Sequence, residues 1–208
     1  EEAQGDKGGY SMKAPATFYK KRIYPLVFML LVTVICILIT SGLYLTTQDR
    51  AVANELSFTR RAILDAAGLE YKPTTEGIEK AYSESISVED GYYTAQSAQG
   101  KRYILPMQGP GLWGTIAIMV GLEEDLSTFS GVAIVSQNET PGLGGRIEEP
   151  WFTKQFQGKR SPFIFVNEGT AKEPNEIDAI TGATRTSDYF KNLTNRASAD
   201  AKRIIRGE

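Results

Sequence analysis

An uncharged segment from Ile23 to Leu45 restricts how this chain can fold more than any other feature. As a helix rising about 1.5 Å per residue it reaches about 34 Å, which is enough to cross the hydrocarbon core of a bilayer. Signal peptides have a shorter apolar region followed by a small-residue cleavage site, and residues 41–48 do not have that pattern. The sequence therefore predicts one transmembrane helix over residues 23–45.

Basic residues flank this segment unequally. Lys20, Lys21 and Arg22 precede it, whereas only Arg50 follows closely. Because cytoplasmic flanks carry the excess of Lys and Arg, we expect the N-terminus in the cytoplasm and the rest of the chain on the other side of the membrane. Residues 1–22 are polar and Gly-containing, so they are predicted to be a flexible cytoplasmic tail.

The amino-acid composition excludes several kinds of metal centre and catalytic site. The 208 residues include no His, and the single Cys, Cys36, lies inside the apolar segment. Zinc sites, iron-sulfur clusters, haem and a Ser-His-Asp triad need such side chains, so no metal site is predicted and redox chemistry would require an organic cofactor. A net charge of -2 argues against nucleic-acid binding.

Beyond the membrane segment, the patterns predict a linking helix over residues 46–72 and one α+β domain over residues 73–208. Gly68 suits the helix C-cap, and residues 75–86 form a second short helix. Period-two patterns predict an antiparallel sheet flanked by helices. Its strands are expected at 92–97, 101–105, 115–122, 129–136 and 163–166.

Two further helices follow the sheet. Pro150 can begin the first, which Gly158 closes. The second ends the chain, with Ser187 as a plausible N-cap. Its apolar stripe has a spacing of three or four residues. The stripe consists of Phe190, Leu193, Ala197, Ala201 and Ile204.

Residues 109–114 match the dinucleotide-binding pattern Gly-x-Gly-x-x-Gly, but they lead into a strand. A Rossmann turn must open a helix, so nicotinamide binding is not expected there. Leu112 and Trp113 could instead approach a flat ligand, and a plain turn between strands is an equal alternative.

A polar loop reads Asp-x-x-Thr-Gly-Ala-Thr from Asp178 to Thr184. Gly182 and its small neighbours leave the Thr184 hydroxyl accessible. Backbone N–H groups at the following helix start, with the Thr186 and Ser187 hydroxyls, could hold a phosphate, and Asp178 could orient a hydroxyl. From these residues alone, a loop that merely caps a helix remains the alternative.

The loop resembles the motif at which a flavin transferase attaches FMN to the final Thr. Residues 139–145, Glu-Thr-Pro-Gly-Leu-Gly-Gly, look like the second signature of the same FMN-binding domain. This family occurs in the C subunit of the sodium-pumping NADH:quinone reductase, Nqr, and in the G subunit of the related Rnf complex. The resemblance extends from the apolar segment through Arg61 to Leu69 and residues 151–159.

The resemblance implies FMN bound covalently, as a phosphoester, to Thr184. It also implies an electron-transfer subunit of an ion-translocating oxidoreductase in the bacterial inner membrane, not catalytic alone. Partners would be a flavin transferase and other membrane, flavin or iron-sulfur subunits. The tether suits repeated electron relay rather than exchange of a soluble substrate. The expected cofactor contacts are Asp178, Thr181, Gly182, Ala183, Thr186, Glu139, Thr140, Gly142, Leu143, Gly144, Leu112, Trp113 and Lys159.

The sequence alone does not decide whether the chain resembles the Nqr C subunit or the Rnf G subunit more closely. Gly-Leu-Trp at residues 111–113 and Ala-Ala-Gly-Leu at 66–69 favour the Nqr C subunit, whereas the chain length is closer to the Rnf G subunit. An anchored binding module with unmodified Thr184 and a stand-alone flavin reductase remain alternatives from other classes. The absence of His weakens the reductase, which needs a proton donor near the flavin.

Overall fold

The protein is described by a computed structural model, which covers residue 20, residues 23–97 and residues 100–207. The chain divides into two compact units, Glu1–Val52 and Ala53–Glu208. The predicted tail, Lys21 and Arg22 lie outside the described residues. So does the tip of the first predicted hairpin, at residues 98–99.

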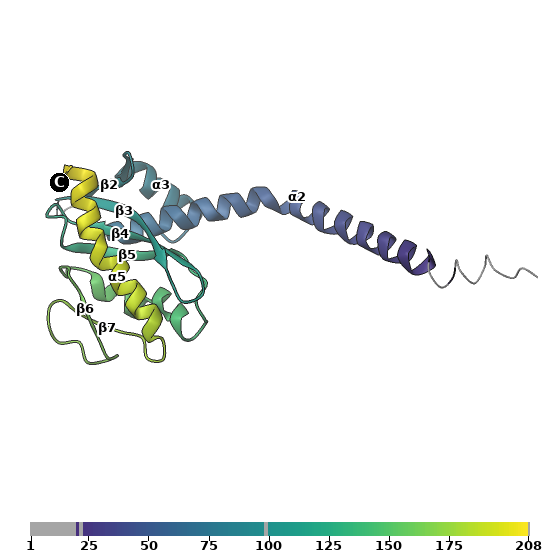
Figure 1. Ribbon diagram of the computed structural model, residues 1–208. Coiled ribbons are helices and arrows are strands. Elements are labelled where there is room, and N and C mark those ends of the chain that lie inside the picture. Colours follow the sequence, from purple (N-terminus) through teal and green to yellow (C-terminus); the bar gives the residue numbers. More distant parts are fainter. Residues whose placement is uncertain (1–19, 21–22, 98–99, 208) are drawn as a thin grey trace, which may run out of the picture. The chain divides into compact units, whose positions relative to one another are not determined.

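Helix α2 is one uninterrupted helix, Tyr24–Ala67 (Figure 1). Its apolar part is long and hydrophobic enough to cross a membrane, with a mean hydropathy of 2.8 over 18 residues. The predicted linking helix over 46–72 is therefore not a separate element. No proline interrupts the chain between Pro25 and Lys72, so the helix continues until Gly68 adopts a positive φ of 62°.

The second unit is built on a five-stranded antiparallel sheet in the order β1-β2-β3-β4-β5, as the α+β prediction required. The strands are β1 (Ile86–Val88), β2 (Tyr93–Ser97), β3 (Gly100–Pro110), β4 (Thr115–Leu122) and β5 (Phe129–Ser136). Strand β1 was not predicted, because it is short and follows helix α3 (Thr75–Ser85) directly. Hairpin β3–β4 pairs Tyr103 with Leu122 and Pro110 with Thr115, so residues 111–114 form its turn.

Helices cover both faces of this sheet (Figure 1). Leu105, Ile118 and Val132 pack toward the C-terminal helix α5 (Thr184–Ala201). Alternate residues such as Ile104, Met119 and Ala133 pack on the end of α2. The period of two in the strands therefore builds two apolar layers, one on each side of the sheet.

The end of α2 is held against the sheet by its own carbonyl groups. Gly68 and Leu69 donate their N–H groups to the carbonyls of Asp65 and Leu64 in a Schellman arrangement. The Ser130 hydroxyl donates to the Ala66 carbonyl at 2.8 Å, and Arg102 donates to the carbonyls of Ala67 and Gly68. A Cβ on Gly121 would lie 1.9 Å from the Ala66 carbonyl oxygen, so only glycine permits this close contact.

Short elements connect the sheet to α5. These are η2 (Gly144–Glu148), α4 (Pro150–Thr153), η3 (Lys154–Phe156), β6 (Ile164–Val166) and β7 (Glu176–Asp178). The helix predicted at Pro150 is confirmed, although its second turn is a 3-10 helix. Strand β6 pairs in parallel with β7, which was not predicted, and does not join the main sheet.

Two predictions for the last helix are wrong. It begins at Thr184, with Ala183 as N-cap, so Ser187 lies one turn inside it. The apolar stripe is buried from Phe190 to Ala201, but Ile204 is 43% exposed. The reason is that the chain changes to π-helical geometry in η4 (Lys202–Arg206), which shifts the helical period.

Candidate functional site

Glu139 joins three segments that are far apart in the sequence. Its side chain is buried, and Oε1 accepts hydrogen bonds from the amides of Leu112 and Trp113 at 2.8 and 3.2 Å. Its Oε2 accepts from the Thr186 hydroxyl at 2.5 Å. One carboxylate therefore fixes the β3–β4 turn, the 139–145 segment and the first turn of α5 to one another.

Glycines let the backbone pack closely around this carboxylate. A Cβ on Gly144 would lie 2.6 Å from the Thr186 hydroxyl oxygen and 2.7 Å from Glu139 Oε2. A Cβ on Gly111 would lie 2.5 Å from Glu139 Oε1. The glycines of both loops thus have a steric role here, and residues 111–114 form a hairpin turn that leads into strand β4 rather than into a helix.

Thr184 is the first residue of α5 and is exposed. Gly182, with φ of 79°, turns the chain just before it, and Ala183 makes no side-chain cap hydrogen bond. The first N–H groups of a helix have no partner within the helix, and they favour an anion. The Thr184 hydroxyl therefore lies at a helix N-terminus. The hydroxyl could form a phosphate ester, and the helix N–H groups could bind the phosphate oxygens.

An apolar surface accompanies this loop. Leu112, Trp113 and Leu143 are 46%, 69% and 45% exposed. The Leu143 Cδ2 atom lies 3.2 Å from the Cβ position of Gly182, so the second signature contacts the Thr184 loop directly. These side chains can cover one face of a flat aromatic ligand.

The rest of the second signature forms a tight turn. The Thr140 carbonyl accepts from the amides of Leu143 and Gly145 at 3.1 and 3.0 Å, and Gly142 has φ of 74°. Thr140 and Gly142 are exposed, as is Thr181 in the acceptor loop, whereas Ala183 is buried. The exposed positions remain available to a ligand.

Several predicted contacts are engaged in other ways. Thr186 is buried against Glu139, and the buried Ser187 hydroxyl accepts from the Ile180 amide at 3.1 Å, so neither hydroxyl is placed to hold a phosphate. Asp178 accepts from the amides of Thr170 and Ala171 and closes the loop before β7. Lys159 donates to the Glu176 carbonyl at 2.6 Å. The structure gives these four residues a folding role.

Sequence reasoning missed Arg146 and Glu168. The Arg146 guanidinium donates to both oxygens of Glu168 at 2.9 and 3.2 Å, and Glu168 Oε2 accepts from the Thr181 amide at 2.9 Å. Arg146 lies in the short helix η2, Glu168 follows strand β6, and 22 positions separate them. No periodicity or motif could have paired them.

The pKa of Glu168 is lowered from 4.5 to about 2, first by the Arg146 guanidinium and then by the Thr181 amide. Because the folded pKa lies below the unfolded one, the stabilisation is complete above pH 4.5 and is lost as the pH falls toward 2. We expect the difference in urea midpoint between the wild type and Glu168→Gln to stay constant from pH 7 to 5 and to shrink below that. A difference that has already disappeared at pH 5 would contradict this assignment.

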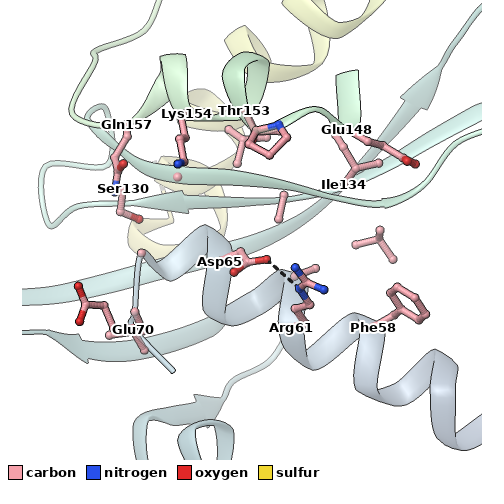
Figure 2. A pocket seen from close by; sticks show the side chains of 18 residues that line it. Phe58, Arg61, Asp65, Glu70, Ser130, Ile134, Glu148, Thr153, Lys154 and Gln157 are labelled. Atoms are coloured by element: carbon pink, nitrogen blue, oxygen red, sulfur yellow. Dashed lines mark ion pairs between the residues drawn. The ribbon is translucent and has the colours of Figure 1, made fainter. Parts of the chain in front are cut away.

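A separate groove of about 850 Å³ lies along β5, between the end of α2 and the α4–η3 segment (Figure 2). Its walls include Phe58, Arg61 and Lys154. None of residues 111–114, 139–145 or 178–187 lines it. Within the part of the chain that the structure describes, no group of three or more His, Cys, Asp or Glu side chains could hold a metal ion. The exposed Thr184 at the start of α5 and the exposed Leu143 beside Gly182 make the Thr184 loop the candidate cofactor site.

Comparison with known proteins supports this choice. Residues 111–199 match the family model described as an FMN-binding domain. The chain is 31% identical over 160 residues to the C subunit of the Na(+)-translocating NADH-quinone reductase of Yersinia pestis, which covers 72% of this chain and 56% of the relative. For the same subunit of Vibrio alginolyticus the identity is 38% over 104 residues, covering 46% and 41%. The chain thus spans only about half the length of these curated relatives, or less.

Solved structures agree on the fold. The corresponding reductase subunit from Parabacteroides distasonis superposes with a TM-score of 0.63 at 23% identity, covering 74% of this chain and 94% of that one. NqrC of Shewanella oneidensis gives 0.59 at 20% identity, covering 69% and 90%. The matched family model includes all three segments that Glu139 joins. Residues 111–199 therefore belong to the FMN-binding domain family, and the chain is similar to the C subunit of the Na(+)-translocating NADH-quinone reductase.

Proposed function

We propose that this chain is a membrane-anchored electron-transfer subunit that carries FMN as a phosphoester on Thr184. The observation that carries the proposal is the placement of an exposed threonine hydroxyl at the N-terminus of α5, beside the exposed side chain of Leu143. Attachment forms a bond between Thr184 Oγ and the flavin phosphorus. The bond from phosphorus to the donor's leaving group breaks, and the hydroxyl proton is released.

The residues of this site fit such a cofactor. Backbone amides at the start of α5 would bind the phosphate, while Leu112, Trp113 and Leu143 would cover the ring system. The turn at residues 140–145 offers backbone groups to the polar edge. FMN would supply reversible electron transfer, and the chain would hold and orient it and tune its potential.

We further propose that the chain works within an ion-translocating NADH:quinone reductase, where other subunits bind NADH and quinone. The relatives named above are C subunits of Na(+)-translocating NADH-quinone reductases, which favours this assignment over the Rnf G subunit. The apolar part of α2 would anchor the chain in the bacterial inner membrane. Lys20, Lys21 and Arg22 would keep its N-terminus in the cytoplasm.

The test is the intact mass of the full chain, purified after production with its flavin transferase and then denatured. The expected mass is that of the polypeptide plus one FMN less one water, and the flavin absorbance should stay with the denatured chain. An unmodified polypeptide that releases yellow flavin on denaturation would reject the covalent bond but keep FMN binding. A colourless unmodified chain would favour an anchored binding module.

A further inference from the structure

Arg146 is held in a fixed position immediately after the second signature. Its guanidinium binds both oxygens of Glu168, and its Nε donates to Glu149 at 3.3 Å. The Trp151 ring lies 5.1 Å from the guanidinium carbon, a cation–π contact. A guanidinium constrained by two carboxylates and one ring has little freedom, so Glu168 has a rigid partner.

Glu168 connects this rigid partner to the acceptor loop. Its Oε2 atom accepts from the Thr181 amide at 2.9 Å, and Thr181 lies three positions before Thr184. On its other side the loop meets Leu143, 3.2 Å from the Cβ position of Gly182. Gly182 is the residue that would otherwise give this loop the most conformational freedom. The loop is therefore restrained from two directions.

We propose that Glu168, held by Arg146, is a positioning residue for the attachment of FMN to Thr184. The proposal rests on the proposed function, in which Thr184 is the acceptor. An ion pair within one helix, such as Lys191 with Asp188, stabilises only its own element. The Glu168 carboxylate instead spans two segments that flank the acceptor hydroxyl. Its loss would lower the fraction of molecules that present Thr184 in the reactive geometry.

The experiment follows attachment over time by intact mass, using the full chain in detergent, its purified flavin transferase and a flavin donor. Glu168→Ala is expected to slow attachment about tenfold and to speed hydrogen exchange of the Thr181 amide by a similar factor. Glu168→Gln keeps an oxygen that can accept from this amide, so it should restore attachment to within about threefold of the wild type. Arg146→Ala should give an intermediate rate, because Glu168 loses its rigid partner.

Asp200→Ala is the matched control. Asp200, near the C-terminal end of α5, forms ion pairs with Arg196 of the same helix and with Arg203 of η4, so its removal also breaks two ion pairs. It should leave the attachment rate unchanged, whatever its effect on the unfolding midpoint. Equal slowing in Asp200→Ala and Glu168→Ala would overturn the proposal, because the effect would then be general destabilisation.

Two further results would also overturn it. The first is a wild-type rate in Glu168→Ala, which rejects positioning but leaves Thr184 as the acceptor. The second is a Glu168→Gln variant as slow as Glu168→Ala, which shows that the hydrogen bond to Thr181 is not what matters. A wild type that takes no FMN at all would reject the proposed function, and the positioning role with it.

Discussion

Thr184→Ala is expected to abolish covalent attachment of FMN completely. Two neighbouring hydroxyls cannot replace the one that is lost, because Thr186 is bonded to Glu139 and Ser187 accepts from the Ile180 amide, and both side chains are buried. Thr181 is exposed, but it lies three positions before the first residue of α5, so it is not at the helix N-terminus that would bind the phosphate. The denatured variant should therefore have the mass of the bare polypeptide, while the wild type carries one FMN less one water.

Two further variants serve as controls for the loss of FMN attachment in Thr184→Ala. Thr184→Ser keeps a hydroxyl at the helix N-terminus and should still be modified, more slowly or less completely. Thr153→Ala removes a threonine hydroxyl from α4, outside the candidate site, and should carry FMN as the wild type does. Modified Thr184→Ala protein would move the attachment point to another residue, and Thr181 would be tested next.

Glu139→Ala is expected to lower the free energy of unfolding of the second unit, Ala53–Glu208, by about 3 kcal/mol. The change leaves the partly buried amides of Leu112 and Trp113 and the buried Thr186 hydroxyl without their shared acceptor. Urea unfolding of the full chain in detergent, followed by tryptophan fluorescence, would measure the loss. Trp113 and Trp151 are the only tryptophans, and Trp113 lies in the turn that Glu139 holds.

Glu148→Ala is a suitable control for this prediction. Glu148 is an exposed carboxylate that accepts from Gln137 at 3.0 Å, close to Glu139 in the sequence. Its loss should cost less than about 1 kcal/mol. Glu139→Gln should fall between the two, since an amide oxygen can replace only part of the carboxylate's acceptor capacity. Equal losses of unfolding free energy in Glu139→Ala and Glu148→Ala would mean that the hydrogen bonds of the Glu139 carboxylate contribute little to stability.

The elements that the sequence predicted well have strong local signals. Strand β4 was placed at its observed ends, because its period of two and flanking turns are clear. Gly68 was identified as the end of a helix because the positive φ needed there favours glycine. The two signatures were found as motifs, and the exposed Thr184 at the start of a helix fits the expectation derived from them.

Other features are not encoded in the local sequence. Asp178 and Thr186 were chosen as cofactor contacts by residue type, and the structure shows that they also make hydrogen bonds within the protein. The Arg146–Glu168 pair depends on the tertiary path of the short elements between the two residues. Strand β7 has three residues and gains its partner, β6, only in the folded chain. The roles of these residues and of strand β7 could be recognised only from the three-dimensional structure.

The hydrogen bonds that hold the end of α2 against the sheet also determine where the chain can be truncated. A fragment beginning after Gly68 would lack the helix end that packs on Ile104, Met119 and Ala133, so much of this apolar cluster would be exposed to water. A fragment beginning near Ala53 keeps that cover and the acceptors for Ser130 and Arg102. The practical boundary between anchor and cofactor domain therefore falls in the middle of a helix.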